Sequence, residues 1–249
     1  MALPTPLEIE RAGLKGWPGI EVEWDRSWVS RASGGHTQRA NSTQCFDPSD
    51  DDDVASRVDA SRRWFEARGI RPTFRVNLLS GPNLVAELDR AGWIEMDHSL
   101  LLAMPLDVVE PDDHGEVLAV DDATFLKSQT DLKQWDDVTL RKFQAITAMF
   151  DVPACGIVLR SDDGRVVSSA LMAVADGIVI TGNVITDAAE RGRGYAKRMM
   201  LTGLAWAQAN GARTAALNVA ADNVAGQALY ASLGYRRQYD YVYRTPGPK

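Results

Sequence analysis

The chain has 249 residues, of which 45% are hydrophobic and 24% are charged, and its net charge is −7. This composition is that of an ordinary globular protein and excludes a disordered, collagen-like or coiled-coil chain. The acidic balance argues against a general nucleic-acid binder, which needs a basic surface to neutralise phosphates.

No targeting, membrane or metal signal is expected. The longest apolar stretches, such as Leu100 to Met104, are far shorter than the ~18–20 residues of a membrane span. The first ten residues lack the basic and apolar regions of a secretory signal. Cys45 and Cys155 form neither a disulfide framework nor a metal motif, which fits a reducing, cytoplasmic location.

In the first half, periodicity predicts a helix, a strand, a helix and a strand, at 52–68, 73–78, 83–91 and 93–104. The first helix has Val54, Val58 and Phe65 on one face. Apolar residues alternate with polar ones from Thr73 to Leu78, as in a half-buried strand. The acidic, proline-containing stretch from Pro105 to Gly115 predicts a linker.

The second half predicts two short helices, then three strands, and then alternating helices and strands. The helices are at 121–131, 136–150, 194–210 and 223–233, and the strands at 157–159, 166–174, 178–186, 213–220 and 235–243. This order predicts one mixed sheet of the α/β (α+β) class.

The chain also resembles itself at an offset of 142 residues. At this offset Gly69 meets Gly211 and Gly92 meets Gly234, so both helix-stopping glycines match, and the order of elements agrees. We therefore predict two tandem units, at 1–106 and 115–249, joined by a linker at 107–114. The first is a shortened copy that lacks the two leading helices.

One local feature is informative against the acidic background. The segment Val184–Ala196 (VITDAAERGRGYA) takes a strand through a glycine-rich loop into a helix, and Arg191, Arg193, Lys197 and Arg198 fall within eight residues. Helix N-termini offer unpaired N–H groups to anions, and glycine lets the backbone approach a bulky ligand. A pyrophosphate is the expected ligand.

The loop does not match the G-x-G-x-x-G fingerprint, because Lys197 stands at the third glycine, and no Walker loop is present. It resembles the acyl-CoA loop [RQ]-x-x-G-x-[GA] of the GNAT N-acetyltransferase superfamily, in the stretch from Arg191 to Ala196. A second GNAT signature follows in order: Asn223, then Leu229-Tyr230, then Leu233-Gly234-Tyr235. Gly226 and Ala188 replace a common alanine and proline of the family, which are mild departures.

The resemblance implies a GNAT-like fold and acetyl-CoA as co-substrate, with no metal. It implies that the cofactor-binding residues are Val184, Ile185, Thr186, Arg191, Gly192, Arg193, Gly194, Tyr195, Ala196, Lys197 and Asn223. Tyr230 would donate a proton to the departing thiolate. Asn223 has an alternative use as a helix cap, and Tyr230 an alternative as a core aromatic residue.

The acceptor and the general base are less defined. Trp135 and Asp136 stand where such proteins bind the acceptor, near other acidic and aromatic residues: Asp131, Asp137, Phe150, Tyr239, Tyr241 and Tyr243. These groups suit a cationic amine, although packing is the better explanation for each aromatic residue taken singly. No residue identifies itself as the base, and Asp187 is also explained as a turn residue.

The first copy has lost the cofactor features. Ser49–Asp53 (SDDDD) corresponds to Arg191–Tyr195, Gly81 to Asn223 and Leu88 to Tyr230. Because aspartates repel a pyrophosphate, we predict one active site per chain. His36 lies in a hairpin-like stretch and is interpreted as a surface histidine, with the alternative that it faces the acceptor pocket.

The leading hypothesis is therefore an acetyl-CoA-dependent N-acetyltransferase acting on a primary amine of a small or amino-acid-like molecule. Alternatives are an enzyme acting on proteins or peptides, and an acyl-CoA sensor without turnover. The aromatic run from Tyr239 to Tyr243 is compatible with a homodimer.

Overall fold

The computed structural model describes residues 2–248, which form two compact units. Unit 1 comprises residues 2–18, 102–218 and 224–236, and unit 2 comprises residues 19–101, 219–223 and 237–248. Each unit thus takes segments from both halves of the sequence. The predicted copies, 1–106 and 115–249, therefore divide the sequence differently from the contacts.

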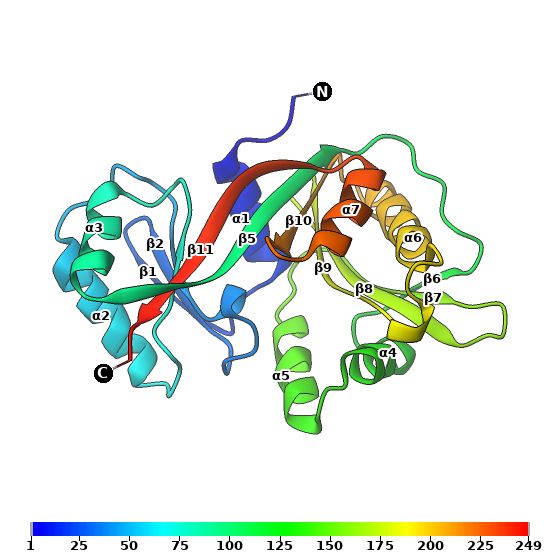
Figure 1. Ribbon diagram of the computed structural model, residues 1–249, viewed down its shortest axis with the longest axis horizontal. Helices are drawn as coiled ribbons and strands as arrows, with labels where there is room; N and C mark the ends of the chain where they lie inside the picture. The colour runs from blue at the N-terminus through cyan, green and yellow to red at the C-terminus, as the bar shows by residue number, and fades with distance from the viewer. Residues whose placement is uncertain (1, 249) are drawn as a thin grey trace. The chain divides into compact units, whose positions relative to one another are not determined.

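The elements are labelled in Figure 1. Those of unit 1 are α1 (Pro6–Gly16), β6 (Gly115–Leu118), α4 (Ala123–Lys133), α5 (Asp137–Thr147), β7 (Ala154–Arg160), β8 (Val166–Ala175), β9 (Ile178–Thr186), η2 (Ala188–Glu190), α6 (Tyr195–Ala209), β10 (Thr214–Ala220) and α7 (Val224–Leu233). Those of unit 2 are β1 (Glu21–Asp25), β2 (Trp28–Ala32), η1 (Gln38–Ala40), β3 (Thr43–Cys45), α2 (Val54–Glu66), β4 (Phe74–Val76) and α3 (Pro82–Arg90). β5 (Trp93–Pro105) and β11 (Arg236–Pro246) contribute residues to both units, as does the end of β10.

The strands of unit 1 run in the order β6-β7-β8-β9-β10. The first four are antiparallel to their neighbours. Gly164 and Gly177 form the tight turns before β8 and β9, with φ angles of 84° and 75° that favour glycine. β10 is parallel to β9, and α6 is the crossover between them.

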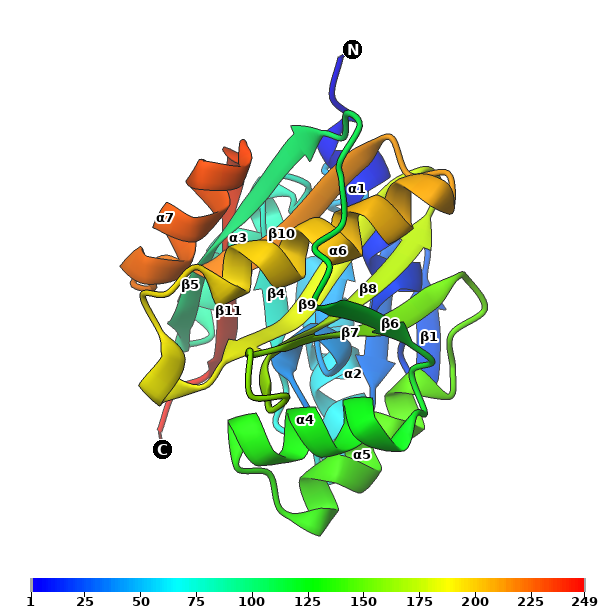
Figure 2. The same ribbon diagram turned by 90° about the vertical axis from the view of Figure 1, so that its right-hand side faces the viewer.

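Helices cover both faces of this sheet. A Cβ on Gly156 of β7 would touch the Phe125 ring of α4, whereas the next residue, Ile157, lies against Gly203 of α6. Successive side chains of a strand point to opposite faces, so α4 and α6 lie on opposite sides. Figure 2 shows α6 crossing the strands on one side. α1 lies on the α4 side, because Gly16 meets Ile180 of β9.

An aromatic cluster joins the helices on the α4 side. The Phe143 ring of α5 lies 6.1 Å from Trp17, 6.1 Å from Phe125 and 5.1 Å from Trp135, measured between ring centroids. Phe143, Phe125 and Trp17 are fully buried. Trp135 thus packs on the core, which supports the packing interpretation of this residue.

Unit 2 has its own hydrophobic core beneath α2 and α3. Its sheet contains β1-β2-β3-β4 followed by β11, and β3 and β4 are parallel. The core residues are Trp28, Cys45, Val54, Val58, Phe74, Leu84, Leu88 and Trp93. On β11, Tyr239, Tyr241 and Tyr243 are also buried, which favours packing over acceptor contact for these three.

The elements repeat at the offset of 142 residues. Shifted by this number, α6 falls on α2, α7 on α3 and β11 on β5, each within about two residues. A pair of equivalent residues also meets, since His98 Nε2 lies 2.8 Å from Asp240 Oδ2.

Several elements differ from the predictions. Helix α1 and strands β1, β2, β3 and β6 were not predicted, and α1 begins with a capping box formed by Thr5 and Glu8. β4 is shorter than expected, because Leu78 lies in a turn and is exposed. His36 is half-buried rather than a surface residue, in a turn where the Asn41 side chain donates to its carbonyl.

A buried arginine secures the start of α2. Arg57 is 7% exposed, stacks 3.9 Å from the centroid of the Trp28 ring, and donates to Asp50 and Asp25. Burial opposes ionisation of Asp50, but hydrogen bonds from Arg57 and Ser27 outweigh it and lower the pKa of this carboxyl. A lowered carboxyl pKa means that this stability is present near neutral pH and is lost on acidification.

We expect Arg57→Leu to lower the free energy of unfolding by about 3 kcal/mol, because it removes the buried cation of Asp50 and leaves only the exposed Arg26, 3.5 Å from that carboxylate. Arg62→Leu is the matched control, since Arg62 forms exposed ion pairs with Asp59 and Glu66 and should cost less than ~1 kcal/mol. Urea denaturation monitored by circular dichroism measures both. Equal losses would contradict the role assigned to Arg57.

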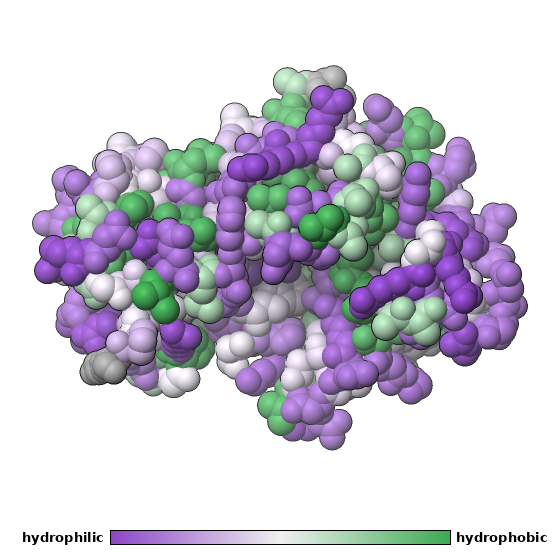
Figure 3. Space-filling model, in the orientation of Figure 1, coloured by the Kyte–Doolittle hydropathy of each residue, from purple (hydrophilic) through white to green (hydrophobic). Residues whose placement is uncertain are grey.

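The surface is largely hydrophilic. Figure 3 shows polar side chains over most of the visible face, interrupted by separate apolar patches. Within residues 2–248, no helix is long and apolar enough to cross a membrane.

Candidate active site

The glycine-rich loop connects β9 to α6 through η2. Gly192 and Gly194 have φ angles of 79° and 82°, in the left-handed region that other residues rarely adopt. A Cβ on either glycine would meet no atom within 4 Å, so the space beside this backbone is open. The glycines are thus required by backbone conformation, and they leave room for a ligand.

The first turn of α6 presents unpaired amides. Gly194 is the N-cap, and no side chain accepts a hydrogen bond from this turn. The first helical bond closes from Arg198 N to the Gly194 carbonyl. The preceding N–H groups and the positive end of the helix dipole therefore face outward, as an anion site requires.

The four basic residues of the loop are not equivalent. Arg193 pairs with Glu190, which also binds Arg165. Arg198 makes a bidentate contact with Asp112, with N–O distances of 2.7 and 3.0 Å, and this hydrogen bonding lowers the pKa of Asp112. Arg198 is thus a structural residue. Arg191 and Lys197 are exposed and, within residues 2–248, form no ion pair, so they are the cations available to a ligand.

β9 and β10 part beside this loop. Their parallel pairing covers Ile178 to Thr181 of β9 only, although β9 continues to Thr186. Val184, Ile185 and Thr186 pair with β8 on one side, or flank a bulge there, and are half-buried. Their other edge is free of β10, which creates a fork between two parallel strands.

Tyr230 of α7 lies close to the fork. Its ring packs edge-on against Tyr235, with 5.8 Å between ring centroids, and Tyr235 lies beside Thr181, the last residue of β9 to pair with β10. Tyr230 is 7% exposed, and burial raises its pKa to about 12. Its hydroxyl makes no hydrogen bond within the described chain, so the phenol is a protonated and available donor.

The chain and its fold have counterparts among known proteins. A family model described as "Probable histone acetyltransferase Rv0428c C-terminal" matches residues 7–244. The chain belongs to this acetyltransferase family. It is therefore an acyltransferase of the GNAT type, as predicted.

Individual proteins and solved structures are also similar to this chain. An uncharacterized N-acetyltransferase of Bacillus subtilis (strain 168), YobR, is 21% identical over 249 residues, which are 95% of this chain and 97% of that protein. A GCN5-related N-acetyltransferase from Kribbella flavida has a TM-score of 0.71 at 20% identity, covering 100% of this chain and 98% of that one. A tandem GNAT protein from the clavulanic acid biosynthesis pathway has a TM-score of 0.66 at 14% identity, covering 100% and 90%. The predicted fold class is confirmed.

The first copy of this GNAT protein carries carboxylates where the second carries the basic loop. The Asp51 carboxylate accepts hydrogen bonds from the amides of Asn83 (2.6 Å) and Leu84 (3.0 Å) at the start of α3. A Cβ on Gly81, the counterpart of Asn223, would lie 2.2 Å from Asp51 Cγ. An internal carboxylate therefore occupies the amides at the start of α3, which is the counterpart of α7 rather than of α6. Glycine is required at position 81 for its approach.

The strand fork is also closed in the first copy. Thr43 pairs with Phe74, and Gln44 with Arg75; at the offset of 142 residues, these β3 positions correspond to Ile185 and Thr186. Thr43 N donates to the Thr73 carbonyl at 2.8 Å. The two copies thus differ at the strand edge as well as in the loop.

The remaining predicted residues have structural contacts. Asp136 caps α5 by accepting from the Thr139 amide at 2.7 Å, a bond that lowers its pKa. Asp187 caps η2 by accepting from Ala189, as a turn residue does. Asn223 is exposed and directly precedes α7. Trp135 lies in the aromatic cluster described above.

Sequence reasoning missed a buried polar group beside β9. Ser128 Oγ and Gln129 Nε2 of α4 both donate hydrogen bonds to Ser169 Oγ of β8. No motif marks these residues, because a serine or glutamine on a helix face carries no spacing signal. Buried polar residues at positions of apolar periodicity were the one available indication.

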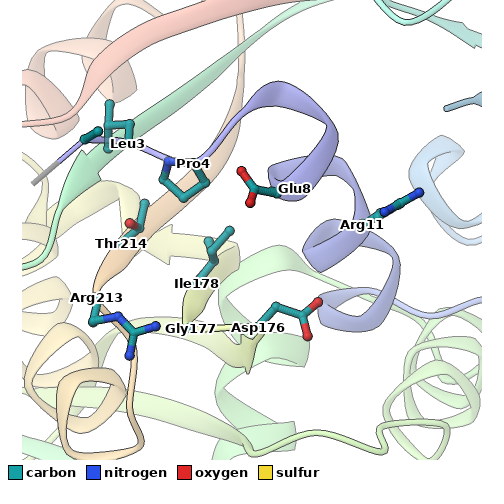
Figure 4. Close-up of a pocket in the computed structure, with 10 residues that line it drawn as sticks. Leu3, Pro4, Glu8, Arg11, Asp176, Gly177, Ile178, Arg213 and Thr214 are labelled. Atoms are coloured by element: carbon teal, nitrogen blue, oxygen red, sulfur yellow. The ribbon is translucent and has the colours of Figure 1, made fainter. Parts of the chain in front are cut away.

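A hollow in unit 1 lies at the opposite end of β9 and β10 from the loop. It has a volume of about 490 Å³ and is bordered by Pro4, Ile178, Arg213 and Thr214, among others (Figure 4). Asp176 at its rim is bound to Lys15. No group of three or more metal-ligating side chains is present in residues 2–248.

Proposed function

We propose that the protein transfers the acetyl group of acetyl-CoA to a primary amine of a small or amino-acid-like molecule. The observation that carries this proposal is the parting of β9 from β10 beside the uncapped start of α6. An anion site next to a free strand edge suits a ligand with a pyrophosphate and an amide-containing arm. Membership of an acetyltransferase family supports the same donor.

Each part of the site then has a role. The amides of Gly192 to Ala196, with Arg191 and Lys197, would bind the pyrophosphate. The free edge of Val184–Thr186 would pair with the pantetheine arm and orient the thioester carbonyl. The neutral amine would attack that carbonyl and the C–S bond would break, with the Tyr230 hydroxyl protonating the departing thiolate. The proton that the amine loses would pass to solvent, from which Tyr230 regains its own. Asn223 would contact the cofactor from the start of α7.

A thiol-release assay tests the proposal. Purified protein is mixed with acetyl-CoA and a panel of amines, amino acids, polyamines, aminoglycosides and short peptides. If thiol is released with only one class of compound, that class is the acceptor. Thiol release with peptides alone would favour a protein substrate. Tight acetyl-CoA binding without release from any acceptor would favour a sensor.

We expect one molecule of acetyl-CoA to bind per chain. The first copy has carboxylates in the place of the loop. Asp51 also occupies the amides at the start of α3, which is the counterpart of α7, where Asn223 would contact the cofactor. Isothermal titration calorimetry measures the stoichiometry directly. A value near two would contradict the assignment of a single site.

A further inference from the structure

β9 contains a bulge at the fork. The pairs with β8 shift between Ser169↔Ile185 and Leu171↔Gly182. Between them β8 has one residue, Ala170, and β9 has two, so one residue of β9 is extra. Asn183 there adopts a left-handed conformation with a φ of 53°. For a residue other than glycine this conformation is unfavourable, and it persists only where the surroundings hold it.

The side chain of Gln129 bridges the two strands at this bulge. Its Nε2 donates to Ser169 Oγ of β8 at 2.9 Å and to the Asn183 carbonyl of β9 at 3.2 Å. A carbonyl can only accept, so the nitrogen must face β9, which fixes the orientation of the amide. Gln129 is fully buried. The contact therefore acts on the backbone of the one left-handed residue in β9.

The side-chain amide of Gln129 is not optimised for stability alone. Gln129 Oε1 is buried and has no hydrogen-bond partner within the described residues, and the same is true of Asn183 Nδ2. A buried polar atom without a partner is destabilising, and an apolar side chain of the same shape would avoid that cost. The benefit of this glutamine must then lie in the geometry that it imposes on β9.

We propose that Gln129 is a positioning residue: it holds the left-handed bulge at Asn183 and so keeps the edge of Val184–Thr186 turned away from β10. A bulge bends its strand and increases the twist, which is what separates β9 from β10 beyond Thr181. This inference rests on the proposed function, because the free edge is where the pantetheine arm would bind.

Two ligands distinguish binding at the loop from binding at the β9 edge. Acetyl-CoA reaches both the loop and the β9 edge, whereas 3′-phospho-ADP carries the pyrophosphate but has no pantetheine arm. In calorimetry, Gln129→Met should weaken acetyl-CoA binding roughly fivefold to tenfold, the worth of one or two hydrogen bonds, and leave 3′-phospho-ADP binding unchanged. Ser128→Ala is the matched control. It removes a buried bond to Ser169 but none to β9, and it should leave the ratio of the two affinities unchanged.

A second substitution tests the bulge itself. Glycine adopts the left-handed conformation freely, so Asn183→Gly added to Gln129→Met should restore acetyl-CoA affinity, which a purely structural role would not predict. If Gln129→Met does not fold, Asn183→Ala disfavours the bulge without touching α4 and should cause the same selective loss. Equal loss of both ligands, loss of neither, or no rescue by glycine would overturn the inference. A wild-type protein that binds neither ligand would instead overturn the proposed function.

Discussion

Tyr230→Phe should lower kcat roughly 100-fold while leaving the Kd for acetyl-CoA unchanged. The substitution removes only the hydroxyl, and the ring keeps its contact with Tyr235. Without a proton donor the thiolate leaves as an anion in a buried place, which raises the barrier of the transfer step. Steady-state kinetics with the acceptor found in the panel, together with calorimetry, measures the two quantities.

Tyr235→Phe is the matched control for this experiment. Tyr235 is a neighbouring buried phenol whose pKa is also raised by burial. It lies beside Thr181 and has no role in the proposed transfer, so loss of its hydroxyl should change kcat less than about threefold. The pKa of Tyr230 is about 12, so its ionisation should not reduce the rate below that pH. An unchanged kcat in Tyr230→Phe would show that another group is the acid.

Gly194→Val should weaken acetyl-CoA binding at least about 100-fold. A β-branched residue is strained at a φ of 82° and places methyl groups beside the amides that would bind the pyrophosphate. Calorimetry gives the affinity, and thermal unfolding gives the cost to the fold. The expected loss of binding exceeds what strain alone produces, because the bulk also blocks the ligand.

A turn outside the site offers a control with the same backbone. Gly164 has a φ of 84°, and its Cβ position is equally open. Gly164→Val should therefore lower the melting temperature about as much as Gly194→Val, because each places a side chain in left-handed backbone at a cost of ~1–2 kcal/mol. Only the loop variant should lose acetyl-CoA. Similar affinities in the two variants would exclude the loop as the cofactor site.

The second half of the sequence predicted its elements well, because its signals are local. α6 repeats apolar residues on one face and stops at Gly211, and the predicted strand at 178–186 coincides with β9. β1 carries no such signal, because all five of its residues are exposed. In β2 both faces are largely covered and the sequence shows no alternation, so polar Arg31 is buried beside apolar neighbours. β4 was predicted from its alternation, but Arg75 on its polar face is buried as well.

The candidate site was predictable where backbone chemistry dictates the residue type. Positive φ angles require glycine at positions 192 and 194, so the sequence motif identifies Gly192 and Gly194. The partners of charged residues were not predictable, since Asp112 reaches Arg198 across 86 residues of sequence. Gln129 is the same kind of case: its importance comes from a bulge in a strand 54 residues away, which no local pattern encodes.

The exchange of segments between the units constrains how the chain can be made. Unit 1 needs residues 224–236, and unit 2 needs residues 237–246 of β11. Neither unit can therefore finish folding until the ribosome has translated the segments that follow the first ~220 residues, although domains generally fold in the order of their synthesis. The core residues of unit 2 all lie between Trp28 and Trp93, so its core can form early, but its sheet stays incomplete until β11 has emerged. Nascent chains of this protein must then hold incomplete sheets, whose open strand edges invite pairing with other chains.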